Sequence, residues 1–145
     1  MDVTEPLLCA ENLSIGYTYD IVRQVSLNVA EKSVLAIVGE SGSGKSTLLK
    51  SLIGPYPGTG IVRQGRILYR GRDILAMGKK ELAAIRGREI SLVFQSPGAT
   101  LNPVRRIGAQ FEETICYHTD LTQKAAREKA AAILRKLNMR DVDRV

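Results

Sequence analysis

Residues Gly39 to Thr47 read GESGSGKST, and this stretch fits the pattern G-x-x-x-x-G-K-[ST] of a phosphate-binding P-loop. Its glycines let the backbone adopt positive φ and approach a phosphate closely. Successive N–H groups then point inward at the N-terminus of the following helix. Lys45 adds a mobile positive charge for the outer phosphates of a nucleotide, and Ser46 offers its hydroxyl to Mg²⁺. The expected nucleotide-binding residues of this P-loop are Gly39, Ser41, Gly42, Ser43, Gly44, Lys45, Ser46 and Thr47.

The sequence on either side supports the motif. Residues 34–38 (VLAIV) are a continuous apolar run, as expected for a strand that is buried on both faces. Apolar residues then recur at helical spacing over 48–53, and Gly54-Pro55 ends the expected helix. Because a strand, a glycine loop and a helix follow in this order, a nucleotide site is favoured over the alternative, a flexible Ser/Gly linker.

The composition is that of an ordinary globular domain, with 145 residues, of which 44% are hydrophobic and 25% charged. No apolar run approaches the ~20 residues that cross a membrane, and the acidic start does not resemble a signal peptide. Cys9 and Cys116 lack a C-x-x-C spacing, so we expect two reduced thiols in a cytoplasmic protein. His118 is the only histidine, which excludes a zinc site built from histidines.

The net charge is +6, and much of it lies within residues 63–88. A basic patch can bind nucleic acid or anionic lipid. These residues alternate with strand positions and lack interleaved aromatic platforms, so a solvated face is favoured and no nucleic-acid partner is expected. They are Arg63, Arg66, Arg70, Arg72, Lys79, Lys80, Arg86 and Arg88.

The pattern predicts an α/β fold that begins with a small antiparallel β-subdomain over residues 1–33. Its strands are expected over 7–17 and 24–30, with turns at 18–20 and 31–33. Tyr17 and Tyr19 stand at the first turn. Either ring could stack on a nucleotide base, although spacing alone favours packing in a core.

A P-loop core is expected over residues 34–103, and the start of a helical subdomain over 104–145. In the first part of the core we predict a glycine-rich connection over 58–65, a strand over 66–70 and a turn at Gly71. A helix over 79–86, stopped by Gly87, should follow. The core should end with a second buried strand over 90–94 and turns over 96–103. Two helices should complete the chain, burying Ile107, Phe111 and Ile115 on the first and Ala126, Ala130, Ile133, Leu134 and Leu137 on the second, with Thr122 as the cap of the second.

A carboxylate that could hold Mg²⁺ during hydrolysis is not evident. In P-loop proteins it usually ends an apolar strand beside the P-loop strand, but the strand over 90–94 ends in Gln95. Asp73 and Asp120 do not follow such strands, and Glu40 is better interpreted as a solvent-facing position of the P-loop. The sequence therefore predicts nucleotide binding without the residues that activate water.

The sequence resembles the ATP-binding subunits of ABC transporters, and among them the oligopeptide, dipeptide and nickel importer group. The resemblance covers nearly the whole chain and depends on the P-loop, the passage from Ile90 to Gln95, the segment Ser96-Pro97 with Leu101-Asn102-Pro103, and Tyr17. It implies a P-loop NTPase core of the RecA type, with ATP and Mg²⁺ as cofactors.

The resemblance also implies roles for single residues. Gln95 would be the Q-loop glutamine, which approaches Mg²⁺ and the attacking water and faces the membrane subunit. Tyr17 would stack on adenine, with Tyr19 as the alternative. Lys45 would bind phosphate, and Ser46 would bind Mg²⁺.

The later motifs of this family are missing: the L-S-G-G-Q signature, the hhhhD-E strand and the switch histidine, since His118 precedes that region. We therefore expect an N-terminal fragment or truncated gene product, incomplete in its C-terminal strands, that binds ATP without turnover. Unpaired strand edges would make it marginally stable.

The resemblance implies an energy-coupling subunit of an importer for peptides or a related small solute. Its partners would be transmembrane permease subunits and a second ATP-binding subunit, on the inner face of the cell membrane. Two alternatives stay open, a non-transport ABC-type ATPase such as a phosphonate-metabolism accessory protein, and an inert nucleotide-binding remnant.

Overall fold

The computed structural model describes residues 5–55, 60–140 and 142 of the chain. They separate into two compact units, Met1–Leu92 and Val93–Val145, and each unit is considered by itself. Among the described residues, no helix combines the length and the apolar character needed to span a bilayer.

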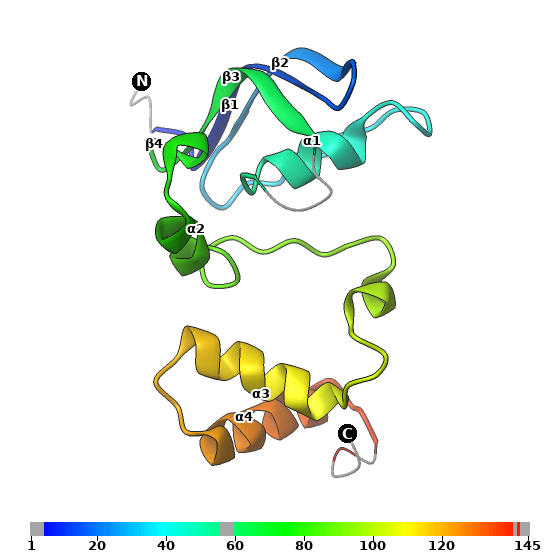
Figure 1. Ribbon diagram of the computed structural model, residues 1–145, viewed down its shortest axis with the longest axis vertical. Helices are drawn as coiled ribbons and strands as arrows, with labels where there is room; N and C mark the ends of the chain where they lie inside the picture. The colour runs from blue at the N-terminus through cyan, green and yellow to red at the C-terminus, as the bar shows by residue number, and fades with distance from the viewer. Residues whose placement is uncertain (1–4, 56–59, 141, 143–145) are drawn as a thin grey trace. The chain divides into compact units, whose positions relative to one another are not determined.

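The first unit contains an antiparallel sheet in the order β2-β1-β3-β4 (Figure 1). The first two predicted strands are present as β1 (Leu8–Gly16) and β2 (Asp20–Val29), although β2 begins four residues before its predicted start and includes the last residue of the predicted turn. The third, β3 (Ile61–Tyr69), begins well before the predicted residue 66 and pairs with β1, and a short β4 (Arg72–Asp73) follows the turn at Gly71. The predicted connection over 58–65 is therefore wrong from residue 61 onward, because Val62 pairs with Ile15 in the sheet. Residues 58 and 59 lie outside the described part.

A core of aliphatic side chains lies between this sheet and the helices of the first unit. The sheet contributes the fully buried Leu13, Ile15 and Ile67. The helix α1 (Lys45–Ser51) lies beside β1 and β2, and its apolar face supplies Leu48, with Leu52 directly after it (Figure 1). The 3-10 turn η1 (Ile74–Ala76) and α2 (Lys79–Ile85) add Ile74, Leu82 and Ile85. This core holds the start of α1, and with it the P-loop, against the sheet.

The predicted buried strands over 34–38 and 90–94 are not present. Val34 is 97% exposed, Val38 89% and Val93 85%. Of these two segments, Ile37 and Ile90 pack against the core, and the pairing is limited to one bridge between Ile90 and Arg86. A central parallel strand needs strands at both edges and helices over both faces. Neither segment meets these conditions among the described residues, so an apolar run alone does not make a strand here.

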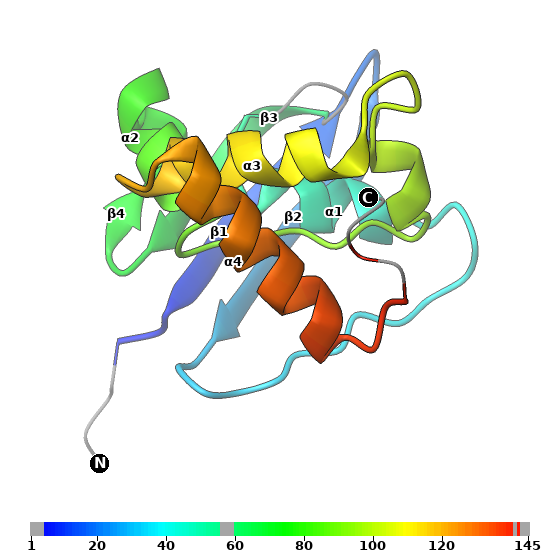
Figure 2. The same ribbon diagram turned by 90° about the horizontal axis from the view of Figure 1, so that it is seen from below.

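The second unit is a helical hairpin preceded by the 3-10 turn η2 (Pro97–Thr100). The predicted helices are confirmed as α3 (Ile107–His118) and α4 (Gln123–Lys136), which pack against each other (Figure 2). The predicted cap is confirmed as well, since the Thr122 side chain accepts a hydrogen bond from the Ala125 N–H.

The predicted buried faces of these helices are only partly correct. Ala126, Ala130 and Leu134 are buried at four-residue spacing, whereas Leu137 is 68% exposed and Ile133 is also exposed. No residue of α3 is buried, so Phe111 and Ile115 are only half-buried and Ile107 is exposed. A pair of helices buries a narrow line of contact, which is narrower than the apolar face that the sequence predicts.

One ion pair on the sheet gives a prediction for pH dependence. Arg66 on β3 donates to the Glu11 carboxylate on β1 at 2.5 Å, and this hydrogen bond lowers the pKa of Glu11. Because the pKa is lowered, the pair stabilises the fold at pH values above ~4.3, the ordinary pKa of a glutamate side chain. This stabilisation is lost as the pH falls through the folded-state pKa. We expect Glu11→Gln to lower the free energy of unfolding slightly at pH 7, and this loss should become smaller in denaturant titrations as the pH falls below the ordinary carboxylate pKa. A loss that stays the same size across the acidic range, down to the pH at which the fold is lost, would contradict this account.

Candidate functional site

The P-loop has a bent backbone that leads directly into α1. Gly42 has φ 81° and Gly44 has φ 90°, values that a residue with a side chain rarely adopts. The Ser43 N–H donates to the Glu40 carbonyl at 3.3 Å, and the Leu48 N–H donates to the Gly44 carbonyl at 2.8 Å. The loop therefore bends at its glycines and joins the helix without a side-chain cap, which leaves N–H groups of the first turn for another acceptor.

Lys45 turns its side chain back across the P-loop. Its Nζ donates to the carbonyl oxygens of Gly39 at 2.8 Å and Glu40 at 2.5 Å, and to the Ser43 Oγ at 3.2 Å. The ammonium group thus lies inside the curve of the loop. A positive charge at this position, close to the N-terminus of α1, favours an anion.

Hydroxyl groups of the site come from the loop and the first turn of α1. Ser41, Ser43 and Ser46 are exposed, and Thr47 is half-buried. Among the described residues, no three His, Cys, Asp or Glu side chains gather where they could hold a metal ion. This donor set fits Mg²⁺ bound in part by a nucleotide, since Mg²⁺ keeps several waters and needs only one or two protein ligands beside phosphate oxygens.

The β1–β2 hairpin places two aromatic rings in the same unit as the P-loop. Tyr17 is 50% exposed and Tyr19 more so, which disfavours the interpretation of these residues as core packing. The P-loop contacts the start of β2, since a Cβ added at Gly44 would lie 3.1 Å from the side chains of Ile21 and Val22. The hairpin loop over 17–19 immediately precedes these residues. The structure therefore brings the phosphate loop close to the strand that carries the aromatic loop.

Gln95 lies in the second unit, where it is exposed and two residues before the start of η2. The strand that should end at Gln95 is not formed, as described above. The P-loop and the β1–β2 hairpin thus belong to the first unit, and Gln95 belongs to the second.

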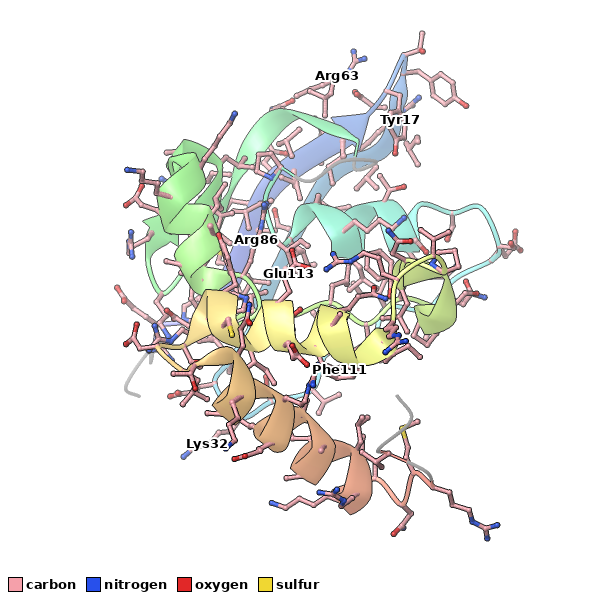
Figure 3. All side chains as sticks on the ribbon, turned by 60° about the horizontal axis from the view of Figure 1, so that its bottom comes forward. Tyr17, Lys32, Arg63, Arg86, Phe111 and Glu113 are labelled. Atoms are coloured by element: carbon pink, nitrogen blue, oxygen red, sulfur yellow. The ribbon has the colours of Figure 1, made fainter. Side chains whose placement is uncertain are left out.

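Four arginines of the predicted basic face bind neighbouring groups. Arg66 pairs with Glu11 and Arg72 with Glu81, as expected for a solvated face. Two other arginines have partners that the sequence analysis missed. Arg86 donates to the carbonyls of Ile53 at 2.9 Å and Pro55 at 2.6 Å, just after α1. Arg63 contacts the tyrosine hairpin (Figure 3). Their partners are distant in sequence, so no local pattern could have revealed them.

Comparisons with known proteins show which proteins this chain is similar to. The family model described as "ABC transporter" matches residues 22–145. The chain is 44% identical over 124 residues to the oligopeptide transport ATP-binding protein AmiE of Streptococcus pneumoniae. This alignment covers 85% of the chain and 35% of AmiE. It is 36% identical over 143 residues to the dipeptide transport ATP-binding protein DppD of Bacillus subtilis, covering 94% of this chain and 43% of DppD. The chain thus spans less than half the length of these curated relatives.

A solved structure supports the fold independently. This structure is the ATP-binding cassette MJ0796 in a dimeric post-hydrolysis state bound to ADP and Pi. It superposes on this chain with a TM-score of 0.73 at 20% sequence identity. The superposition covers 92% of this chain and 58% of the MJ0796 chain. The predicted fold class, a P-loop NTPase with an antiparallel β-subdomain, is therefore confirmed even though the strands over 34–38 and 90–94 are not formed.

Proposed function

This chain belongs to the ABC transporter family, and from that premise we propose that it is the ATP-binding part of an importer subunit for peptides or a related small solute. The names of AmiE and DppD support the solute class. The observation that carries the proposal is the P-loop itself, in which the Lys45 ammonium lies inside a curve of glycine backbone at the start of a helix.

Each P-loop group has a role in binding ATP. The backbone N–H groups of Ser41 through Thr47 would donate to the phosphates, and Lys45 would exchange its loop carbonyls for β- and γ-phosphate oxygens. The Ser46 hydroxyl would bind Mg²⁺. The bound ion would neutralise charge on the phosphate oxygens.

Hydrolysis needs more than this site. Gln95 is proposed to orient the attacking water and to approach Mg²⁺. A metal carboxylate is expected at the end of an apolar strand beside the P-loop strand, but the segment 90–94 is followed by Gln95. We therefore propose that this chain by itself binds ATP with little or no turnover. Calorimetry with Mg·ATP and a phosphate-release assay test this, and steady phosphate release by the isolated chain would contradict it.

Transport would require partners. We propose transmembrane permease subunits and a second ATP-binding subunit, with the chain on the inner face of the cell membrane. Co-expression with permease subunits of a peptide importer, followed by membrane fractionation, tests this assembly. The chain should sediment with membranes only when the permease is present.

The exposed ring of Tyr17 gives a prediction for base recognition. Stacking of a base on an aromatic side chain is worth ~1–3 kcal/mol, so Tyr17→Ala should weaken ATP binding by roughly 5- to 150-fold. Binding of tripolyphosphate, which has no base, should be unchanged. Tyr19→Ala is the matched control, because that ring lies on the same loop. If only the Tyr19 variant loses affinity for ATP, the stacking residue is Tyr19 and the assignment of Tyr17 is wrong.

A further inference from the structure

Arg63 on β3 reaches the loop that carries the two exposed tyrosines. Its Nη2 donates to the backbone carbonyl of Tyr17, and its Nε lies 3.5 Å from the Asp20 Oδ1. Figure 3 shows Arg63 and Tyr17 at the same end of the sheet. The two contacts bracket the loop, since Tyr17 is its first residue and Asp20 is the first residue of β2.

The ion pair has a physical reason to persist. The Asp20 Oδ1 is buried and accepts no hydrogen bond from any residue that the structure describes. The Asp20 side chain as a whole is 35% exposed, and a carboxylate oxygen without a hydrogen-bond donor is stabilised by a nearby cation. The Arg63 guanidinium supplies that charge from the neighbouring element while it also binds the Tyr17 carbonyl.

The loop itself is folded tightly. A Cβ added at Gly16 would lie 1.9 Å from the Tyr19 carbonyl oxygen and 2.8 Å from the Asp20 Cα. The backbone over 17–19 therefore folds back over the end of β1, where Gly16 pairs with Asp20 on one side and Ile61 on the other. The guanidinium of Arg63 ties this compact loop to β3, two residues after Ile61.

We propose that Arg63 is a positioning residue, which fixes the backbone of Tyr17 so that its ring presents one face to an adenine base. This inference rests on the proposed function, in which Tyr17 stacks on the base of ATP. A stacking ring has only two side-chain torsions, so its orientation depends on the backbone that carries it. Without Arg63, the loop would keep its ring but lose the hydrogen bond at Tyr17 and the ion pair at Asp20 that hold its two ends.

The test measures the affinity of the 145-residue chain for Mg·ATP and for tripolyphosphate by calorimetry. In the Arg63→Ala variant, a less ordered loop should lose part of the binding free energy that comes from stacking of the base on Tyr17. ATP binding should therefore weaken about three- to tenfold, and tripolyphosphate binding should be unchanged. Arg63→Lys keeps the charge beside Asp20 and one donor for the Tyr17 carbonyl, so it should recover part of the affinity. Arg66→Ala is the control. It also removes an arginine from β3, but the partner of this arginine is Glu11 and not the loop that carries Tyr17.

A double-mutant cycle separates positioning from general stability. In a Tyr17→Ala background, Arg63→Ala should cause no further loss of ATP affinity, because there is no ring left to orient. Equal losses for ATP and tripolyphosphate, or an undiminished loss in the Tyr17→Ala background, would overturn the positioning role while leaving ATP binding by the P-loop intact. Failure of the folded wild-type chain to bind either probe would overturn the proposed function and this inference together.

Discussion

Lys45→Ala is expected to weaken the binding of Mg·ATP by roughly a hundredfold, or about 3 kcal/mol, because charge-assisted hydrogen bonds contribute ~1.5–3 kcal/mol each. The ammonium already lies inside the P-loop, with donors directed at Gly39, Glu40 and Ser43. These are exchangeable partners at the surface, so phosphate oxygens can replace them at little cost. Removing the amine removes the one side-chain cation of the loop. Calorimetric titration with Mg·ATP measures the effect.

The matched control is Lys79→Ala, which removes the same charge from the exposed first turn of α2. It should change the affinity for Mg·ATP less than twofold, about the size expected from screened surface charge. Thermal denaturation of both variants verifies that they are folded. If the two variants bind Mg·ATP equally well, Lys45 does not bind phosphate and the P-loop assignment fails.

The second large effect is on stability and comes from Gly65 in β3. This residue has φ 89°, and a Cβ added there would lie 2.4 Å from the Glu11 carbonyl oxygen and 2.6 Å from that of Asn12. Both atoms belong to the backbone of β1, where the register with β3 shifts, so neither can move without breaking the sheet. We expect Gly65→Ala to lower the free energy of unfolding by about 3 kcal/mol or more, from backbone strain and steric overlap together.

Gly78→Ala is the control for this substitution in the same unit. Gly78 has φ −69°, and the contact that its added Cβ would make is with the end of the Glu81 side chain at 3.8 Å. Its effect should stay below about 1 kcal/mol, the cost of a weaker helix N-cap. Chemical denaturation followed by circular dichroism compares the two. Equal midpoints would mean that β3 does not pass as close to β1 as the structure indicates.

Features with a local cause were predictable from the sequence. The glycine spacing and Lys45 predicted the P-loop and the start of α1, the alternating residues predicted the β1–β2 hairpin, and a threonine before a helical pattern predicted the cap at Thr122. In each case the residues that specify the element lie within a few positions of it. Local rules were therefore sufficient.

Features that depend on distant neighbours were not predictable in the same way. The run over 34–38 has the composition of a buried strand, but its conformation depends on strands at both edges, and Val34 and Val38 are exposed instead. Likewise, Arg63 is 46 positions from Tyr17, and only the register of β3 with β1 brings them together. The strained conformation of Gly65 follows from the same register.

The central claim is that the glycine loop holds the phosphates of ATP. Amide chemical shifts in a titration of the ¹⁵N-labelled chain with Mg·ATP test it most directly, because they report where the nucleotide binds. The account predicts that the largest changes fall on Gly39–Thr47, with smaller ones on the hairpin loop around Tyr17, all saturating with one dissociation constant. Shifts that leave Gly39–Thr47 unchanged while other residues respond, or no response from a folded chain, would contradict it.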